Sequence, residues 1–158
     1  DRTKYGIPKR GFGNIIPSLG TMALLKEVDV KLMIMGRGPS MAGLVSKKIE
    51  SENSEAGIIL YEEMEKKHAG KDTYGFGERT IGSIANSLVR NEKLQEAVEV
   101  AEYGVKRYPE SSTSHYVLAA AYEKTGNTQK AIMSYKKSLD INPEFKRAQG
   151  ALEKLEEK

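Results

Sequence analysis

Two short motifs in the C-terminal half of the chain contain the residue types of an activated serine nucleophile. Ser134 and Lys137 have the Ser-x-x-Lys spacing, and Lys124, Thr125 and Gly126 form a Lys-Thr-Gly triplet. In catalytic use the serine lies far upstream of the Lys-Thr-Gly strand, whereas here the order is reversed and the gap is short. The two motifs therefore indicate no hydrolase site, and we expect no catalytic residue in this chain.

A glycine-rich turn in the N-terminal half could bind an anion. Gly36, Gly38 and Gly43 follow an apolar run and open a predicted helix, so backbone N–H groups and the helix dipole would face a phosphate. The spacing is not Gly-x-Gly-x-x-Gly, however, and no second strand–helix unit follows. A plain strand-to-helix turn therefore explains these residues better than a phosphate site does.

The composition argues against most other kinds of functional site. The 158 residues include no Cys, and the two histidines, His68 and His115, are far apart, so we expect neither a metal site nor a cofactor. The formal net charge of +3 does not favour nucleic-acid binding. No apolar run reaches the roughly 18 residues of a membrane helix, so we expect no membrane span. The absence of Cys leaves the cellular compartment open.

The first forty residues have the composition of turns and strands. They hold six of the fifteen glycines and three of the five prolines, which is a density that interrupts helices. Two apolar runs, 21–25 and 28–35, are separated by Lys26 and Glu27 and predict a β-hairpin. We therefore expect residues 1–39 to form a β-rich segment that could be the end of a larger domain.

Helical periodicity begins where glycine and proline become sparse. Ser40 is a plausible N-cap for a helix over 40–51. A second helix is predicted over 54–67, where apolar residues recur at the helical spacing. Residues 40–77 thus form a helical pair followed by a loop, and we expect this pair to extend the array that comes after it.

A repeat of 34 residues occupies the rest of the chain. Residues 81–109 align with 115–143, with large residues on large, small on small and proline on proline. The pairs are Ile84 with Leu118, Ala85 with Ala119, Leu88 with Tyr122, Ala97 with Ala131, Ala101 with Tyr135, Val105 with Leu139 and Pro109 with Pro143. Such a period predicts stacked helix–turn–helix units. We predict two units and a capping helix over 78–158.

These residues resemble the tetratricopeptide repeat, or TPR. Residues 112–145 are the better copy, with Leu118, Ala119, Tyr122, Gly126, Ala131, Tyr135 and Pro143 at the motif positions. The first copy, 78–111, departs from the motif, because Glu92 replaces the turn glycine and Gly104 stands where alanine is usual. The resemblance implies a mainly α fold: a TPR-like solenoid of helical hairpins with a capping helix over 145–157.

The same resemblance implies a peptide-binding groove lined by the first helix of each unit. Its side chains are a mixed set that leans basic, which suits a protein or peptide partner with acidic residues. The groove positions are Arg79, Asn86, Arg90, Thr113, Tyr116, Ala120, Lys124, Arg147 and Lys154. The alternative is that these positions form an ordinary solvated helix face.

One well-known kind of TPR groove is not expected here. The chaperone-binding type holds a terminal carboxylate with a clamp of Lys, Asn and Arg. Asn86 stands at one clamp position, but Gly82 and Val117 occupy positions where Lys and Asn are expected. We therefore predict that the chain does not form a chaperone-tail clamp.

A second resemblance covers more of the chain. The segments 74–78 and 135–143 are similar to the C-terminal TPR extension of bacterial β-lactamase-like serine hydrolases, and the segment 13–22 resembles the turn into the last strands of the hydrolase domain in that family. This resemblance implies a parent hydrolase, or an α/β-hydrolase esterase with a similar tail, whose catalytic part is missing from this chain. The first residue, Asp1 rather than Met, fits a processed product or a fragment.

The sequence thus leads to three hypotheses about function. The first is a non-catalytic TPR module for protein–protein interaction, without cofactor or metal. The second is the C-terminal part of a serine hydrolase or esterase. The third is self-association through the open edges of the repeat array.

Overall fold

The computed structural model describes residues 40–68 and 75–157, all within Pro39–Lys158, one of two compact units of the chain. These described residues form seven helices and no strand. The helices are α2 (Met41–Ser51), α3 (Ser54–His68), α4 (Glu78–Arg90), α5 (Leu94–Arg107), α6 (Ser112–Lys124), α7 (Thr128–Ile141) and α8 (Lys146–Glu156). The predicted mainly α fold is present there, whereas the β-hairpin and the β-rich segment predicted over 1–39 lie outside the described residues.

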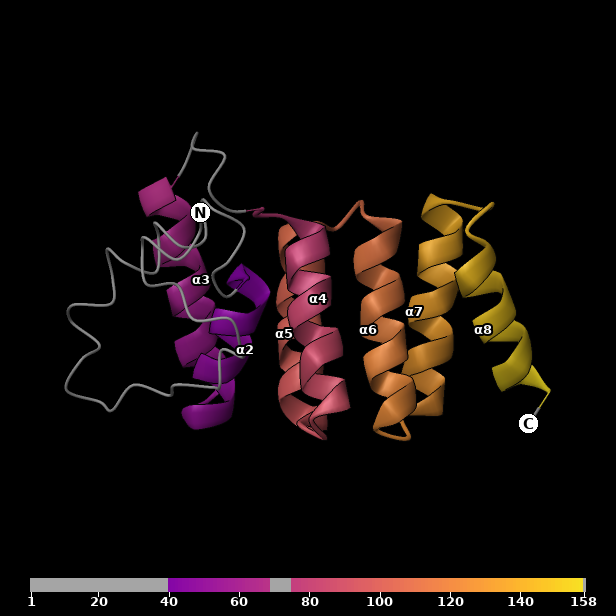
Figure 1. Ribbon diagram of the computed structural model, residues 1–158. Helices are drawn as coiled ribbons and strands as arrows, with labels where there is room; N and C mark the ends of the chain where they lie inside the picture. Colours follow the sequence, from indigo (N-terminus) through magenta and orange to yellow (C-terminus); the bar gives the residue numbers. More distant parts are fainter. Residues whose placement is uncertain (1–39, 69–74, 158) are drawn as a thin grey trace, which may run out of the picture. The chain divides into compact units, whose positions relative to one another are not determined.

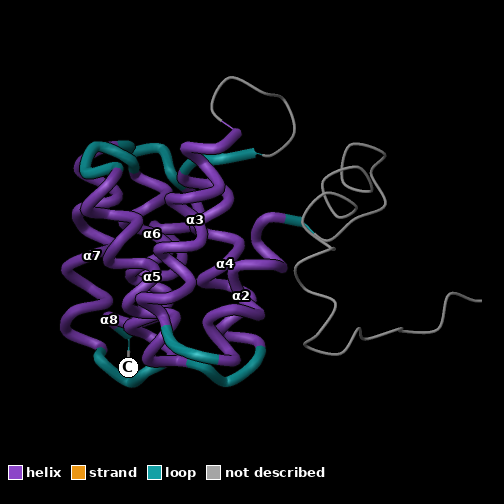
Figure 2. The backbone as a smooth tube through the Cα atoms, turned by 90° about the vertical axis from the view of Figure 1, so that its left-hand side faces the viewer, coloured by secondary structure: helices purple, strands orange, loops and turns teal. Residues whose placement is uncertain are grey.

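The helices pack as successive antiparallel hairpins (Figure 1). α2 pairs with α3, α4 with α5 and α6 with α7, and α8 packs against α7. Between hairpins, the first helices contact one another directly, α2 with α4 and α4 with α6. Figure 2 shows the short loops that join the helices at the two ends of the hairpins. Residues 40–68 therefore extend the array, although they fall outside the 34-residue register.

Serine side chains define the start of two helices. The Ser40 hydroxyl accepts a hydrogen bond from the Gly43 N–H at 3.1 Å, as an N-cap residue does. The Ser111 hydroxyl accepts one from the Ser114 N–H at 3.1 Å at the start of α6. The predicted N-cap at Ser40 is confirmed.

The turns inside the two repeats have the same backbone geometry although their residues differ. Gly126 has a φ of 78° and Glu92 has a φ of 60°, both in the left-handed region. Each residue donates its N–H to the carbonyl three residues before it, Glu123 for Gly126 and Val89 for Glu92, at 3.1 and 3.2 Å. The departure from the motif at Glu92 therefore changes the residue and leaves the turn in place.

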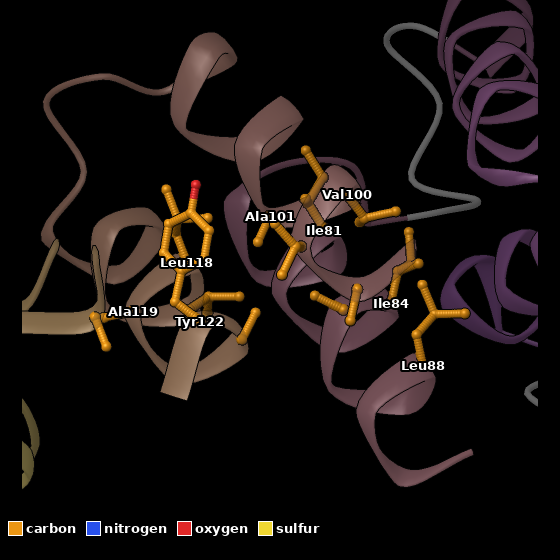
Figure 3. Close-up of a cluster of buried hydrophobic side chains, with 14 of the residues drawn as sticks. Ile81, Ile84, Leu88, Val100, Ala101, Leu118, Ala119 and Tyr122 are labelled. Carbon is orange, nitrogen blue, oxygen red and sulfur yellow. The ribbon is translucent and has the colours of Figure 1, made fainter. Parts of the chain in front are cut away.

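One core runs through the hairpins. Figure 3 shows side chains of α4, α5 and α6 meeting in it, with Leu88, Val100 and Leu118 among them. Ala97 and Ala131, the equivalent small residues of the two repeats, are both 0% exposed and lie within this core. Each hairpin thus buries its apolar stripe against its neighbours.

The first hairpin has an even closer crossing. Gly57 of α3 is buried against Ile49 of α2, and a Cβ atom at Gly57 would lie 2.1 Å from Ile49 Cγ1. No real side chain fits within that distance, so only glycine allows α2 and α3 to pack at this separation.

Polar side chains join α3 to α5. We call this set of contacts the α3–α5 seam. Its hydroxyl, carboxylate and guanidinium groups form hydrogen bonds between α3 and α5, the second helices of the first two hairpins. The pairs are Ser54 with Glu99, Tyr103 with Glu62 and Arg107 with Glu65. The seam adds side-chain hydrogen bonds to the apolar contacts that connect α2 with α4.

Candidate peptide-binding face

The predicted groove residues of α4 form one exposed stripe. Arg79, Asn86 and Arg90 are seven and four residues apart, which places them on one face of the helix, and all three are exposed. The opposite face carries the buried residues of the core. Ser83 lies in the same stripe and was missed by the sequence analysis, although its spacing of four residues from Arg79 is a sufficient signal.

The α4 stripe is basic and contains no carboxylate. The one acidic residue of α4 is Glu78, which begins the helix and lies outside the stripe. Within the part of the chain that the structure describes, neither Arg79 nor Arg90 forms an ion pair. The two guanidinium groups are therefore available to an external anion. About three turns of helix, or roughly 16.5 Å, separate their positions, which is the length of a short peptide segment.

α6 lies beside α4 and runs in the same direction (Figure 1). Lys124 is exposed in the last turn of α6, at the same end of the array as Arg90 of α4. Thr113 and Ala120, the other predicted positions on this helix, are half-buried. The structure therefore places Lys124 at the same end of the array as Arg90, whereas the other two predicted positions of α6 are partly covered.

Tyr116 belongs to an aromatic cluster as well as to the predicted groove. Its ring centroid lies 5.7 Å from that of Tyr135 in α7 and 5.1 Å from that of Phe145, the N-cap residue of α8. The Tyr135 hydroxyl donates to Glu123 at 2.9 Å, and burial together with this hydrogen bond raises the pKa of Tyr135. The half-buried Tyr116 ring thus connects three helices and presents only part of its surface to a ligand.

The two predicted positions on α8 are exposed. Arg147 is in the first turn of α8, which the contact between Phe145 and Tyr116 holds next to α6. Lys154 follows two turns later, on the same face of the helix. Neither residue forms an ion pair with another described residue. We call the set Arg79, Ser83, Asn86, Arg90, Tyr116, Lys124, Arg147 and Lys154 the first-helix face.

The positions of a carboxylate clamp are used for helix packing. Gly82 is buried on α4, and a Cβ atom there would lie 3.3 Å from Val117 Cγ2 of α6. Val117 itself is 9% exposed. The two positions at which the sequence analysis found Gly and Val instead of Lys and Asn therefore form a contact between the first helices.

The other sequence candidates lie in helices and turns. Ser134 and Lys137 are one turn apart on α7, and Gly126 forms the turn after α6. His115 Nε2 lies 2.9 Å from the Pro109 carbonyl oxygen, and His68 is buried at the end of α3. The described residues contain no group of three acidic, His or Cys side chains that could hold a metal ion. None of the described helices combines the length and apolar character needed to cross a membrane.

Comparison with known proteins gives the class of the fold. Residues 112–145 match the family model for the tetratricopeptide repeat. The chain thus contains a TPR region, and its repeats form the helical hairpins described above. No curated protein matched the sequence.

Two solved structures share this arrangement of helices. The Naa15/Naa10 complex bound to HypK-THB matches 73% of this chain at 23% identity and a TM-score of 0.50. This chain spans only 16% of the length of that match. The first TPR of Spaghetti (RPAP3), bound to the HSP90 peptide SRMEEVD, matches 82% of this chain at 16% identity and a TM-score of 0.51, with 94% of its own length covered. At these identities the similarity shows the fold alone.

Proposed function

We propose that this TPR region is a non-catalytic protein–protein interaction module that binds an extended acidic peptide on its first-helix face. The basic stripe on α4 carries the proposal, because Arg79 and Arg90 are exposed, lie on one face and have no carboxylate beside them in that stripe. Lys124 and Arg147 add positive charge on the neighbouring helices. Both matched structures, one of them a TPR, were solved with a peptide or protein partner, which supports this general role.

The HSP90 peptide bound in the Spaghetti structure is not the kind of ligand that we propose for this chain. A tail carboxylate held by a clamp needs a lysine where this chain has Gly82, and that position is buried against Val117. We therefore propose that acidic side chains within the peptide, rather than its terminal carboxylate, pair with the arginines of α4. Bidentate Arg–carboxylate pairs would fix the peptide's register along the helix.

Peptide binding is tested with an array of extended peptides in which Asp and Glu are exchanged for Asn and Gln. We expect the full chain to bind acidic members and to lose affinity for their amide counterparts. Exposed charge pairs contribute up to about 1 kcal/mol each, so replacing Arg79 and Arg90 by Gln should weaken binding about five-fold per residue. The matched control replaces Lys67 and Lys106, exposed residues of the second helices, by Gln and should leave the affinity for the peptide unchanged.

Two results would exclude acidic-peptide binding on this face. One is an array without any acidic peptide above background. The other is an affinity that falls equally in the arginine variant and in the lysine control, since that would reflect net charge rather than the α4 stripe. Circular dichroism of each variant separates lost binding from lost structure.

The alternative, the C-terminal part of a β-lactamase-like serine hydrolase or esterase, rests on sequence resemblance, and the matches lend it no support. Activity in this chain would have to come from its own residues. Incubation with a chromogenic ester and a chromogenic β-lactam tests this directly. Turnover that survives purification of the full chain to homogeneity would replace the non-catalytic proposal.

A further inference from the structure

Two large apolar side chains are exposed among the described residues. Ile59 of α3 is 49% exposed and Met133 of α7 is 71% exposed. Isolated exposed apolar residues are common on protein surfaces and need no explanation by themselves. Ile59 and Met133 differ from such isolated residues because each lies among charged residues. The charges around Ile59 are mainly acidic, and those around Met133 are mainly basic.

The face of α3 around Ile59 is acidic. Glu55 lies one helical turn before Ile59, Glu63 lies one turn after it, and both are exposed. Lys66 continues the same face by one further turn. None of these charged groups forms an ion pair with another described residue. We call Glu55, Ile59, Glu63 and Lys66 the α3 patch.

The face of α7 around Met133 has the opposite charges in the same order. Lys130 precedes Met133 by three residues, Lys137 follows it by four, and Asp140 lies one turn further. All are exposed, and none forms an ion pair with another described residue. The Lys130 ammonium lies 5.2 Å from the centre of the Tyr122 ring. We call Lys130, Met133, Lys137 and Asp140 the α7 patch.

The two patches match in length as well as in charge. Eleven residues separate the ends of the α3 patch and ten separate those of the α7 patch. At the helical rise these spans are about 16.5 and 15 Å. Laid side by side in the same direction, the helices pair acid with base at three positions and Ile59 with Met133 between them.

We propose that the chain self-associates through a parallel contact between the α3 patch of one copy and the α7 patch of another. The contact is heterologous, so every pair of copies leaves one free patch of each kind, and association is open-ended or closes into a ring. Two short helix faces form a small interface, so binding is weak and requires high protein concentration. This surface is separate from the first-helix face, and the proposal does not depend on peptide binding.

Mass measured over a concentration series of the full chain is the first test. Light scattering coupled to gel filtration should give a mass that rises above that of the monomer as concentration increases. The mass should return toward the monomer at about 1 M salt, where the screening length is about 3 Å. A chain that stays monomeric at every concentration would overturn the proposal.

Charge reversal identifies the surfaces. The variant Glu55→Lys with Glu63→Lys and the variant Lys130→Glu with Lys137→Glu should each be monomeric. An equimolar mixture should associate again, because the reversed α3 patch of one variant then faces the reversed α7 patch of the other. Control reversals at Lys106 and at Glu153, exposed residues outside both patches, should leave the mass unchanged. A mixture that stays monomeric, or association in either variant alone, would contradict the assigned surfaces.

The direction of the helices is tested at the ends of the patches. In the parallel arrangement Lys66 pairs with Asp140, so Lys66→Glu should weaken association and adding Asp140→Lys should restore it. In an antiparallel arrangement Lys66→Glu would relieve repulsion and strengthen association, which would refute the parallel contact. Ile59→Gln and Met133→Gln change no charge and should each weaken association. They provide a test if a reversed variant fails to fold.

Discussion

The turn residue Glu92 should be a source of instability, and Glu92→Gly should stabilise the protein. Glu92 has a φ of 60° and is exposed, and its carboxylate forms no hydrogen bond or ion pair with the described residues. A residue with a Cβ pays about 1–2 kcal/mol in the left-handed region. Glycine avoids this strain, but its freedom in the unfolded chain costs about 0.4–1 kcal/mol. The net gain is therefore about 0.5–1 kcal/mol.

Gly126 provides the reciprocal change in the second repeat. It has a φ of 78°, and a Cβ atom there would meet nothing within 4 Å, so Gly126→Ala introduces backbone strain without a steric clash. By the same balance this variant should lose about 0.5–1 kcal/mol. The two turns have equivalent hydrogen bonds, so the two changes should be close in size and opposite in sign.

Urea unfolding followed by circular dichroism measures both changes. For a chain of this size, 1 kcal/mol also shifts Tm by about 2–4 °C. The control Glu92→Ala removes the carboxylate and keeps the strain, so its midpoint should equal that of the unmodified chain. A gain in Glu92→Ala equal to that in Glu92→Gly would refute the backbone argument, because the gain would then come from the lost charge. A loss of stability in Glu92→Gly would refute it as well.

Two further predictions concern packing and pH. Gly57→Ala should destabilise the first hairpin by about 1–3 kcal/mol, because its Cβ would lie 2.1 Å from an Ile49 atom, whereas Gly150→Ala, with open space around it, should be neutral or stabilising in thermal unfolding. Burial raises the pKa of Tyr61 to about 12, and burial with a hydrogen bond to a carboxylate raises that of Tyr122 to about 12. In the unfolded chain these tyrosines ionise near pH 10, below their pKa in the folded protein. The free energy of unfolding should therefore be unaffected below pH 10 and should fall as the pH rises toward 12. Urea unfolding midpoints measured at each pH test this.

The repeat made much of the fold predictable from the sequence. Small residues recur at Ala97 and Ala131, and proline recurs at the end of each unit, so spacing alone indicates which faces meet. The helix bounds follow from the same periodicity and from N-cap serines such as Ser40. The position of the turn at Glu92 was predictable from the repeat, but its backbone conformation was not. Glu92 has a left-handed φ, which is uncommon for a residue with a side chain, so the residue type alone gave no sign of it.

Contacts outside the repeat could not be predicted from spacing. The α3–α5 seam joins residues more than forty positions apart, and α3 lies outside the 34-residue register. The candidate face shows the same limit. The resemblance to the tetratricopeptide repeat implied a groove position for Tyr116, but its partners Tyr135 and Phe145 come from two other helices. The face of a helix on which a residue lies follows from local spacing in the sequence. The exposed fraction of its side chain depends on contacts with the neighbouring units.

The contact between Gly82 and Val117 restricts how this array could evolve. A lysine at position 82 would have to displace Val117 Cγ2, which lies 3.3 Å from the site of its Cβ atom. The two positions are therefore coupled, and their substitutions are not additive. A side chain at position 82 would therefore fit more easily beside a residue shorter than valine at position 117. The close approach of α4 and α6 thus links the two positions that a carboxylate clamp would use.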